Sequence, residues 1–424
     1  MSVGVVVMNK RGVAIAADSA MTLERSDYDY KVLPSANKIH LLSSKGPVAV
    51  VHAGSAHFME FPWETAFGAY HRIHGAESFG SLLAHGTNFI EFLRSYQHFC
   101  GEERQKDYVR YVIEECLEHL RSQIWVRILA ERRDKRSKEL EREKEIARQY
   151  IMAEQTACAS QPCDDSFPDA HDGTCRDLYF DDYEVLHSEI CWPYAKEIFE
   201  EKEFKALSEP VWDIVLHWLK RNPDRESGTL SQLTMVGYGD HEEFPSLVEY
   251  SIHGIANGHL KVFQERIVPV DFLDAARIEV IGQGDVVQNF VYGADSDVLS
   301  AFTEALARQL YPRMATEILD SVSGISDNEK QELLEKYQEP DTGTVSQLTN
   351  MLIEFSVAYS KDSIMTVVEH LSIIDLASIA DKLADLTSFR RQISTDRPTV
   401  GGPIDVALLS KDGGFRWFKQ KGAL

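Results

Sequence analysis

Long hydrophobic runs are missing from this 424-residue sequence. A membrane-spanning helix needs about 20 consecutive apolar residues, and no segment approaches that length. The first apolar run, Val3–Met8, is followed at once by Asn9, Lys10 and Arg11, whereas a signal peptide needs a longer apolar stretch. We therefore expect neither a membrane partner nor export, and we expect a cytoplasmic protein.

Basic residues are also scarce. The chain has 44 Lys and Arg against 67 Asp and Glu, which gives a formal net charge of -23 at pH 7. Binding to nucleic acid depends on clustered Lys and Arg side chains that contact phosphates. The composition therefore argues against a nucleic-acid partner.

Cysteine is absent from both ends of the chain, and all six cysteines fall in one central stretch: Cys100, Cys116, Cys158, Cys163, Cys175 and Cys191. In a cytoplasmic protein, reduced thiols or a metal site are more usual than disulfides. The weak candidate zinc ligands are Cys158, Cys163, His171 and Cys175, whose C-x4-C and H-x3-C spacings fit familiar zinc sites only loosely. Ordinary thiols are the favoured interpretation, so we expect no metal and no cofactor.

Apolar residues make up 44% of the chain, enough for a large core. Short apolar runs bounded by Gly, Pro or Ser predict strands at 3–8, 13–17, 38–42, 48–54, 233–238, 246–252 and 276–281. Helical patterns fill 58–221 and 297–389, with polar loops expected at 26–30 and 159–182, and a hairpin closes the chain at 404–410 and 415–419. This order of strands and helices predicts an α+β fold in which helices cover sheets.

Three sequence motifs resemble the N-terminal third of proteasome β subunits and their bacterial relatives. They are G-V-A-I-A-A-D-S-A-M-T at 12–22, N-K-I at 37–39 and V-V-H-A-G-S-A at 50–56. The resemblance resumes at V-G-Y-G-D (236–240), I-G-Q-G (281–284) and T-V-G-G (399–402). It implies the four-layer αββα sandwich of the N-terminal-nucleophile (Ntn) hydrolases. The matching halves predict a discontinuous core of residues 1–95 and 228–424, with a mostly helical, cysteine-containing insertion at 96–227.

The same resemblance implies a set of active-site residues. Counting back from the Ala-Ala-Asp motif without a gap places the family's nucleophile on Ser2, after removal of Met1. The catalytic aspartate falls on Asp18, the catalytic lysine on Lys38 and the oxyanion-hole glycine on Gly54. A further aspartate of the family maps to Asp396 with an offset of one residue, and a valine at position 400 stands where the family has serine.

The chemistry of Ser2 can be argued from the residues themselves. Initiator methionine is generally removed before a residue as small as serine, which would leave the Ser2 hydroxyl beside a free α-amine. The usual pKa of that amine, about 7.7–8.0, leaves it partly neutral at cytoplasmic pH, so it can accept the hydroxyl proton. Lys38 would stabilise the alkoxide, Asp18 would orient the lysine, and the Gly54 N–H would face the developing oxyanion.

Each of these residues also has an ordinary structural interpretation, because a serine at position 2, a strand-terminal Asp and a Lys before a strand are all common. Three functions therefore remain open. The leading one is a serine- or threonine-type Ntn peptidase or amidohydrolase that acts on a peptide or protein substrate. The others are a catalytically inactive proteasome-β-like assembly subunit, and a binding module that works through its helical insertion. The family resemblance also implies a homo-oligomer; whether an ATPase or other regulatory partner exists is left open.

Overall fold

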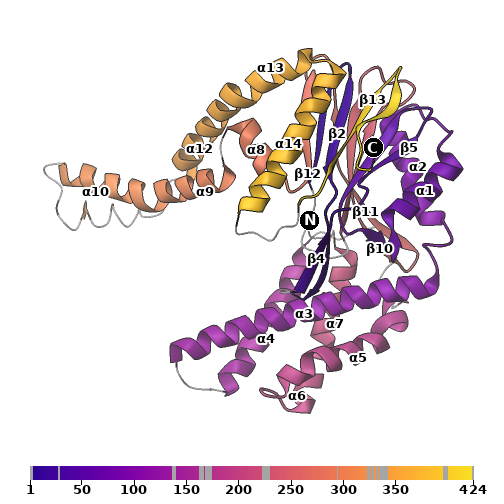
Figure 1. Ribbon diagram of the computed structural model, residues 1–424. Coiled ribbons are helices and arrows are strands. Elements are labelled where there is room, and N and C mark those ends of the chain that lie inside the picture. The colour runs from indigo at the N-terminus through magenta and orange to yellow at the C-terminus, as the bar shows by residue number, and fades with distance from the viewer. Residues whose placement is uncertain are drawn as a thin grey trace.

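The computed structural model describes residues 3–26, 29–135, 140–161, 167, 174–221, 230–293, 295–321, 326, 329–330, 333, 342–394 and 400–422. Its helices and antiparallel sheets agree with the expected α+β class. Within these residues, no helix combines the length and the apolar character that crossing a bilayer would require. Figure 1 shows the sheets at the centre, with a group of helices below them and a long helical projection at one side.

The first sheet joins the two ends of the chain. Its strand order is β12-β1-β2-β13-β14, and every pairing is antiparallel. The strands are β1 (Val3–Asn9), β2 (Gly12–Asp18), β12 (Ala276–Gly282), β13 (Ile404–Ser410) and β14 (Gly414–Lys419). Since β2 pairs with β13, the N-terminal and C-terminal hairpins share one sheet. The predicted division into a core and an insertion stays a prediction.

The first turn fastens the β1–β2 hairpin to a helix junction at the other end of the chain. Asn9 pairs with Gly12, which leaves a two-residue turn. The Asn9 side chain accepts a hydrogen bond from the Arg11 N–H (2.8 Å) and donates to the carbonyl oxygens of Val368 (2.8 Å) and Leu371 (3.0 Å). One buried amide thus stabilises the turn and also pairs carbonyls at the C-terminal end of α13 (Asp362–His370).

The second sheet has the order β11-β10-β9-β6-β5, again antiparallel throughout. Its strands are β5 (Ile39–Ser43), β6 (Val48–Gly54), β9 (Ser231–Gly237), β10 (Ser246–Ala256) and β11 (His259–Pro269). Two short hairpins lie outside both sheets: β3 (Met21–Ser26) with β4 (Asp29–Leu33), and β7 (His57–Phe58) with β8 (Phe61–Pro62).

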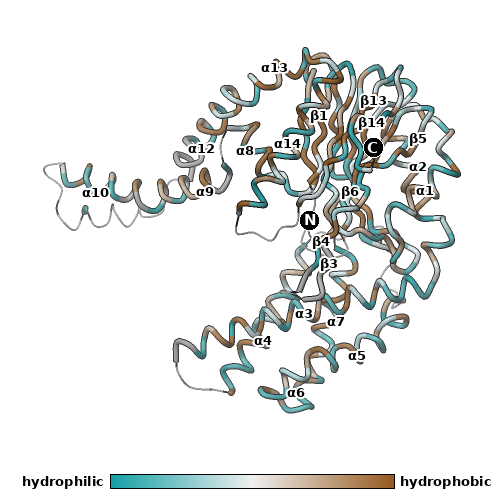
Figure 2. The backbone as a smooth tube through the Cα atoms, in the orientation of Figure 1, coloured by the Kyte–Doolittle hydropathy of each residue, from teal (hydrophilic) through white to brown (hydrophobic). Residues whose placement is uncertain are grey.

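The two sheets pack face to face through side chains that alternate along each strand. Val6 and Met8 of β1 lie in an apolar cluster with Val51 and Val236 of the second sheet. Their neighbour Val5 points the opposite way, toward helices. Because both faces of β1 are buried, its sequence is an unbroken apolar run and does not alternate with polar residues. Figure 2 shows hydrophobic positions concentrated in these strands.

Helices cover the outer face of each sheet. On the first sheet these are α8 (Asp285–Tyr292), α13 and α14 (Ile373–Ile393), and α14 begins with a capping box between Ser372 and Asp375. On the second sheet they are α1 (Trp63–His74), α2 (Leu82–Ser95), α3 (Glu102–Lys135) and α7 (Ser208–Lys220). The buried Trp63 ring donates its N–H to Ser231 Oγ at 2.8 Å, which joins α1 to β9.

The other helices of the region 102–220 are α4 (Leu140–Ser160), α5 (Thr174–Ala195) and α6 (Glu201–Lys205). The loop expected at 159–182 is therefore shorter than predicted, because residues from Thr174 onward are helical. A Gly-Thr pair with Asp nearby suggests a loop locally, but Cys175, Tyr179 and Tyr183 supply a buried face at helical spacing.

Sequence reasoning missed strands β3, β4 and β11, and the two-residue strands β7 and β8. Of the segment 26–30, where a loop was expected, Ser26 belongs to β3, and Asp29 and Tyr30 belong to β4. This hairpin pairs with neither main sheet, so its strands carry no apolar alternation. Strand β11 is an edge strand whose central residues, including Glu265 and Arg266, are exposed or only partly buried. β3, β4 and β11 all lack the apolar pattern that buried strands show.

The histidine His187 on α5 is buried between aromatic rings. Its ring stacks on Phe204 (centroids 4.4 Å apart) and on Tyr183 (5.5 Å). Burial lowers the pKa of His187 to about 4. In the unfolded chain the imidazole takes up its proton near the usual pKa of 6.5, so between these values the unfolded state binds more protons and acid favours unfolding.

We expect His187→Phe to reduce this acid sensitivity, because a phenyl ring keeps the aromatic stack without a protonatable nitrogen. Between pH 7 and pH 4.5 the wild type should lose about 2 kcal/mol more unfolding free energy than the variant. Urea unfolding at both pH values measures the difference. The comparison at pH 7, where His187 is neutral in both states, isolates any packing effect. Equal losses in the two proteins would contradict the assignment.

Candidate functional site

A buried carboxylate, Asp18, lies at the end of β2 and accepts hydrogen bonds from four donors. Its Oδ1 receives the Val3 N–H (3.0 Å) and the Lys38 ammonium (2.5 Å). Its Oδ2 receives the N–H groups of Ala20 (3.2 Å) and Gly401 (3.1 Å). The side chain has no solvent exposure, so these donors replace water completely. Asp18 thus joins β1, the start of β5 and the segment before β13.

The lysine of this pair, Lys38, directly precedes β5, and only 4% of its side chain is exposed. Burial lowers its pKa because an ammonium ion loses its hydration, while the nearby Asp18 carboxylate opposes that effect. The positive charge of Lys421 lowers the pKa of Lys38 further. Asp18 is consequently the group that holds the proton on Lys38.

The second cation, Lys421, follows the closing hairpin and reaches back to the beginning of the chain. Its ammonium group donates to Ser19 Oγ (3.0 Å), to Asp405 Oδ2 (2.9 Å) and to the carbonyl oxygen of Ala36. Ser19 and Ala36 are themselves joined by a backbone hydrogen bond of 3.0 Å. Lys421 therefore fixes the residues that follow Asp18 against the residues that precede Lys38.

Two histidines lie beside Lys38 on the side facing α1. The rings of His40 and His52 are 5.7 Å apart, and both approach Phe67, at 4.9 and 5.9 Å. Burial, with the positive charge of Lys38 as a smaller cause, lowers the pKa of His52 to about 3. Its buried Nδ1 has no hydrogen-bond partner. This wall of the site is neutral and largely aromatic at physiological pH.

The glycine at the end of β6, Gly54, is required by its backbone. Its φ of +83° lies in the left-handed region, and a Cβ there would come within 2.3 Å of the Leu230 carbonyl oxygen. The next N–H, of Ser55, donates to that same oxygen at 2.8 Å. Gly54 therefore has a structural reason to be glycine whatever its chemical role.

The position where the resemblance leads us to expect serine carries a hydrocarbon side chain. Val400 is buried in the apolar cluster beneath α14, with 3% of its surface exposed. It offers no hydroxyl to a neighbouring active site. The adjacent Gly401 contributes through its backbone, by the hydrogen bond to Asp18.

The sequence-predicted residues are thus partly brought together. Asp18 and Lys38 are in direct contact, and Gly54 ends the strand whose His52 N–H bonds the Lys38 carbonyl oxygen (3.3 Å). Ser2 and Asp396 lie outside the described residues. Sequence reasoning missed Lys421 and His52; a lone lysine after a hairpin carries no signal of a contact with residue 19, 402 positions away.

The weak zinc candidates are tested only in part. Cys158 and Cys175 are buried among the helices of the 102–220 region, while Cys163 and His171 lie outside the described residues. Over the part of the chain that the structure describes, no three His, Cys, Asp or Glu side chains gather in an arrangement suited to a metal ion.

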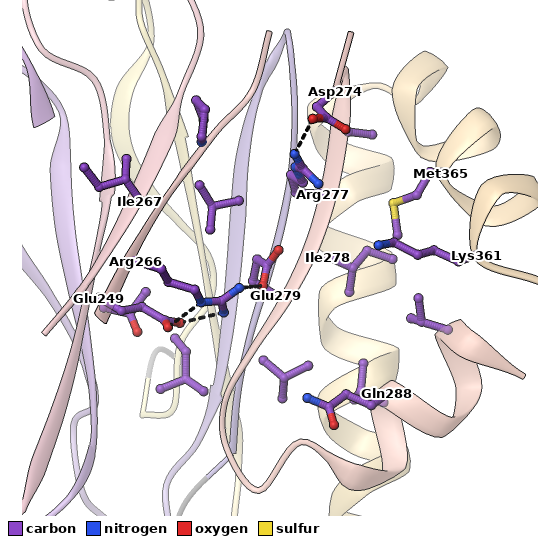
Figure 3. Close-up of a pocket in the computed structure, with 18 of the residues that line it drawn as sticks. Glu249, Arg266, Ile267, Asp274, Arg277, Ile278, Glu279, Gln288, Lys361 and Met365 are labelled. Carbon is purple, nitrogen blue, oxygen red and sulfur yellow. Dashed lines mark hydrogen bonds and ion pairs between the residues drawn. The ribbon is translucent and has the colours of Figure 1, made fainter. Parts of the chain in front are cut away.

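A large groove of about 1040 Å³ lies between β11 and β12, the edge strands of the two sheets, and is bordered by α8 and α13 (Figure 3). Arg266 crosses it, bonded to Glu249 (2.6 and 2.9 Å) and to Glu279 (2.8 Å). Arg277 pairs with Asp274 at 2.7 Å. Both arginines are thus neutralised by carboxylates. The lining also includes Glu265, Asp362 and Glu369 against one further cation, Lys361, so it does not favour an anionic ligand.

Comparisons with known proteins do not identify a family. No protein-family model matches the chain, and no curated protein matches it. One similar solved structure is the Anbu (Gly-1) mutant from Hyphomicrobium sp. strain MC1, with 9% identity over 100% of this chain and 89% of that chain. The TM-score of 0.27 is too low for the similarity to support an argument about fold or function.

The burial of the Asp18–Lys38 pair yields a stability prediction. Asp18→Asn and Lys38→Met should each lower the unfolding free energy by about 3–5 kcal/mol, because each leaves one buried group without its partner. The double variant should be less destabilised than the sum of the single variants by about 2 kcal/mol. Urea unfolding of the four proteins gives the coupling. Lys205→Met, which breaks an exposed ion pair with Glu201, is the control and should hardly shift the midpoint. Additive losses would show that the pair does not act as a unit.

A second prediction concerns the charge of Lys421. Lys421→Met should raise the pKa of Lys38, because it removes a nearby positive charge and leaves Asp405 unpaired. An NMR titration of the Lys38 side chain measures the shift. Lys419→Met is the matched control, since Lys419 lies two residues away but pairs with Asp381 (2.8 Å). The same Lys38 pKa in both variants would argue against the interaction.

Proposed function

We propose that the chain is an Ntn amidohydrolase or peptidase whose nucleophile is Ser2, exposed as the N-terminal residue when Met1 is removed. The observation that supports this function is the shared use of Asp18 Oδ1. That one oxygen accepts both the Val3 N–H and the Lys38 ammonium. Ser2 directly precedes Val3 in the sequence, so this shared acceptor supports the choice of Ser2 as nucleophile and of Lys38, whose pKa burial lowers, as the residue that assists it.

In the proposed reaction, the neutral α-amine of Ser2 accepts the proton of its own hydroxyl as the oxygen attacks the substrate carbonyl. The new bond joins Ser2 Oγ to the carbonyl carbon, and the amine later returns the proton to the leaving nitrogen. Water then hydrolyses the acyl-enzyme. The products are a carboxylic acid and an amine, and the enzyme regains its starting state.

The other residues of the proposed site have distinct roles. Lys38, kept charged by Asp18, lowers the energy of the developing alkoxide. The backbone N–H of Gly54 is the proposed donor to the oxyanion, and Asp396 is the proposed second acid of the site. The neutral aromatic wall of His40, His52 and Phe67 favours a substrate side chain without charge. A peptide or another amide fits this chemistry. Assembly into a homo-oligomer and a cytoplasmic location complete the proposal.

One observation favours a second candidate function, an inactive assembly subunit that keeps the fold. Val400 places a buried hydrocarbon where the resembled family has a hydroxyl. An enzyme of this design would have to work with one polar group fewer. The two candidates differ in whether Ser2 reacts, and a labelling experiment separates them.

We expect an electrophilic probe that reacts with N-terminal nucleophiles, such as a β-lactone or an epoxyketone, to modify the wild-type protein on the peptide that begins with Ser2. Ser2→Ala removes the attacking oxygen while still permitting removal of Met1, so labelling should be lost. Lys38→Met should also reduce labelling strongly, and the double variant should be hardly worse than Ser2→Ala, because residues acting as a unit give non-additive losses. Mass spectrometry of tryptic digests measures the modification.

The matched control is Ser55→Ala, which removes an exposed serine hydroxyl near Gly54 without touching the proposed nucleophile. It should label like the wild type. Intact mass must first establish that Met1 is absent and the α-amine free. If protein with a free Ser2 amine resists every such probe, the assembly subunit becomes the better assignment.

A further inference from the structure

The two sheets are offset, so that the second sheet extends past the first at one side. β12, the last strand of the first sheet, packs over β6 and β9 of the second sheet. β10 and β11 continue the second sheet beyond that point, and among the described residues no strand of the first sheet follows β12. The groove of about 1040 Å³ lies here, between β12 and the uncovered part of β10 and β11 (Figure 3). It is the place where a sixth strand of the first sheet would lie.

The floor of the groove is polar, although it belongs to the inner face of a sheet. Leu247, Glu249 and Ser251 alternate along β10 and therefore lie on one face. Leu247 is in the apolar cluster between the two sheets, whereas Glu249 and Ser251 line the groove. The strand thus changes from apolar to polar side chains at the point where the first sheet stops covering it. Such a floor suits a ligand that brings polar groups of its own.

β12 has one free backbone edge, on the side away from β1. The Val3 N–H donates to a side chain at the end of β2, so the backbone of Val3 faces β2. Backbone groups of successive residues in an antiparallel strand point to opposite sides, so Val6 faces β12, where its partner is Glu279. The neighbours of Glu279, Ile278 and Val280, therefore direct their N–H and C=O groups away from β1. They form an edge to which a further strand can pair.

The groove offers two different surfaces, one on each side of the plane of the first sheet. Ile278 and Val280 pack with Met365 in the apolar cluster beneath the helices. Glu279 points the opposite way and bonds Arg266 on the floor, as Figure 3 shows. Side chains alternate along a strand, and those of neighbouring strands align, so a strand added beside β12 would place every second side chain against the apolar surface. The remaining side chains would meet the floor.

The floor carries more carboxylates than cations. Its charged residues are three glutamates and one arginine: Glu249, Glu265, Glu279 and Arg266. Their formal charges, -3 and +1, sum to -2. Glu249 and Glu279 share Arg266, whereas Glu265 is exposed. The other charged residues of the lining are balanced by a neighbour: Arg277 by Asp274, Glu369 by Lys10, and Lys361 by the adjacent Asp362. The floor therefore favours Lys or Arg side chains and repels acidic ones.

We propose that this groove binds an extended segment of another protein, which pairs with β12 as a further strand of the first sheet. The segment carries apolar and basic side chains in alternation, with the apolar ones toward the helices and the basic ones toward the floor. Backbone hydrogen bonds to the free edge supply affinity, and the two surfaces supply specificity. β12 is seven residues long, which sets the length of the segment that it can pair. The volume of the groove lies at the upper end of the range for small-molecule sites, about 300–1,000 Å³, and suits a chain segment.

The experiment measures binding of a fluorescent peptide to the full-length protein by fluorescence anisotropy. The peptide has seven residues, the length of β12, in which valine and lysine alternate. We expect saturable binding. A peptide with glutamate in place of lysine should bind at least tenfold more weakly, because the floor repels carboxylates. A peptide with the valines and lysines in two blocks should also bind at least tenfold more weakly, because it cannot match both surfaces.

Backbone methylation separates strand pairing from attraction between charges alone. In a paired strand, the N–H groups of alternate residues point to the neighbouring strand and the others point away. N-methylation of one alternate set of residues in the valine–lysine peptide should therefore abolish binding, and N-methylation of the other set should leave it unchanged. This comparison uses the wild-type protein, so it does not depend on the folding of a variant. Equal affinities of the two methylated peptides would overturn the proposal.

A charge reversal on the floor tests the location of the site. Glu265→Lys should weaken binding of the valine–lysine peptide about tenfold, since it places an ammonium group where the peptide brings another. The matched control is Glu317→Lys, the same change at an exposed residue of α10 (Tyr311–Ser321), which should bind like the wild type. Circular dichroism and thermal melting check the folding of both variants.

The groove does not depend on the chemistry proposed for Ser2. Ser2→Ala should bind the valine–lysine peptide like the wild type, so this test and the labelling of Ser2 succeed or fail separately. Three further results would each refute the proposed site. They are the absence of saturable binding, equal binding of the alternating and block peptides, and equal effects of Glu265→Lys and Glu317→Lys.

Discussion

The hydrogen bonds to the Asp18 carboxylate hold together three parts of the chain: the N-terminal hairpin, the start of β5 and the segment before β13. Val3 and Ala20 are near neighbours along the chain, but Lys38 comes from the second sheet and Gly401 from the segment before β13. A buried carboxylate without donors would be too costly to keep charged, so its presence requires all three parts of the chain to be in place. The first sheet, the second sheet and the C-terminal hairpin therefore meet at the Asp18 carboxylate. Lys421 stabilises this junction through its hydrogen bonds to Ser19 and Asp405.

The sequence predicted the fully buried strands well. β1, β2, β6 and β13 begin and end within one residue of the expected positions, because apolar runs with turn residues at each end leave little choice. The edge strand β14 was predicted equally well, although most of its side chains are exposed. β3, β4 and β11 were missed, since strands that lie outside the main sheets or at an edge have no need of buried faces. The helix α5 began earlier than expected because burial against neighbouring helices outweighed a loop-like local composition.

For the candidate site, the sequence indicated individual residues but not the contacts between them. Asp18 and Lys38 were singled out through a family resemblance, and their contact is a fact of the tertiary structure that neither residue's local sequence encodes. The role of Lys421 depends on a contact between the last residues of the chain and Ser19, which no hydrophobic periodicity in the sequence indicates. The unpaired Nδ1 of His52 likewise became visible only when its surroundings were known. Local sequence patterns predict helices and strands, whereas ion pairs between residues remote in the sequence are seen only in the folded structure. The catalytic roles of the five site residues stay predictions: Ser2, Asp18, Lys38, Gly54 and Asp396.

The pairing of β2 with β13 has a consequence for synthesis of the protein. β2 is translated within the first 18 residues, yet one of its two neighbours arrives only at residues 404–410. Until then the apolar hairpin of β1 and β2 has an open edge, and it leaves the ribosome long before its sheet can be completed. Unpaired apolar edges of this kind are prone to aggregation during folding. Emergence of β13, and not of the N-terminal hairpin, is therefore the step at which the core of this protein can close, and a nascent chain stalled before residue 404 should depend on chaperones that bind exposed apolar strands.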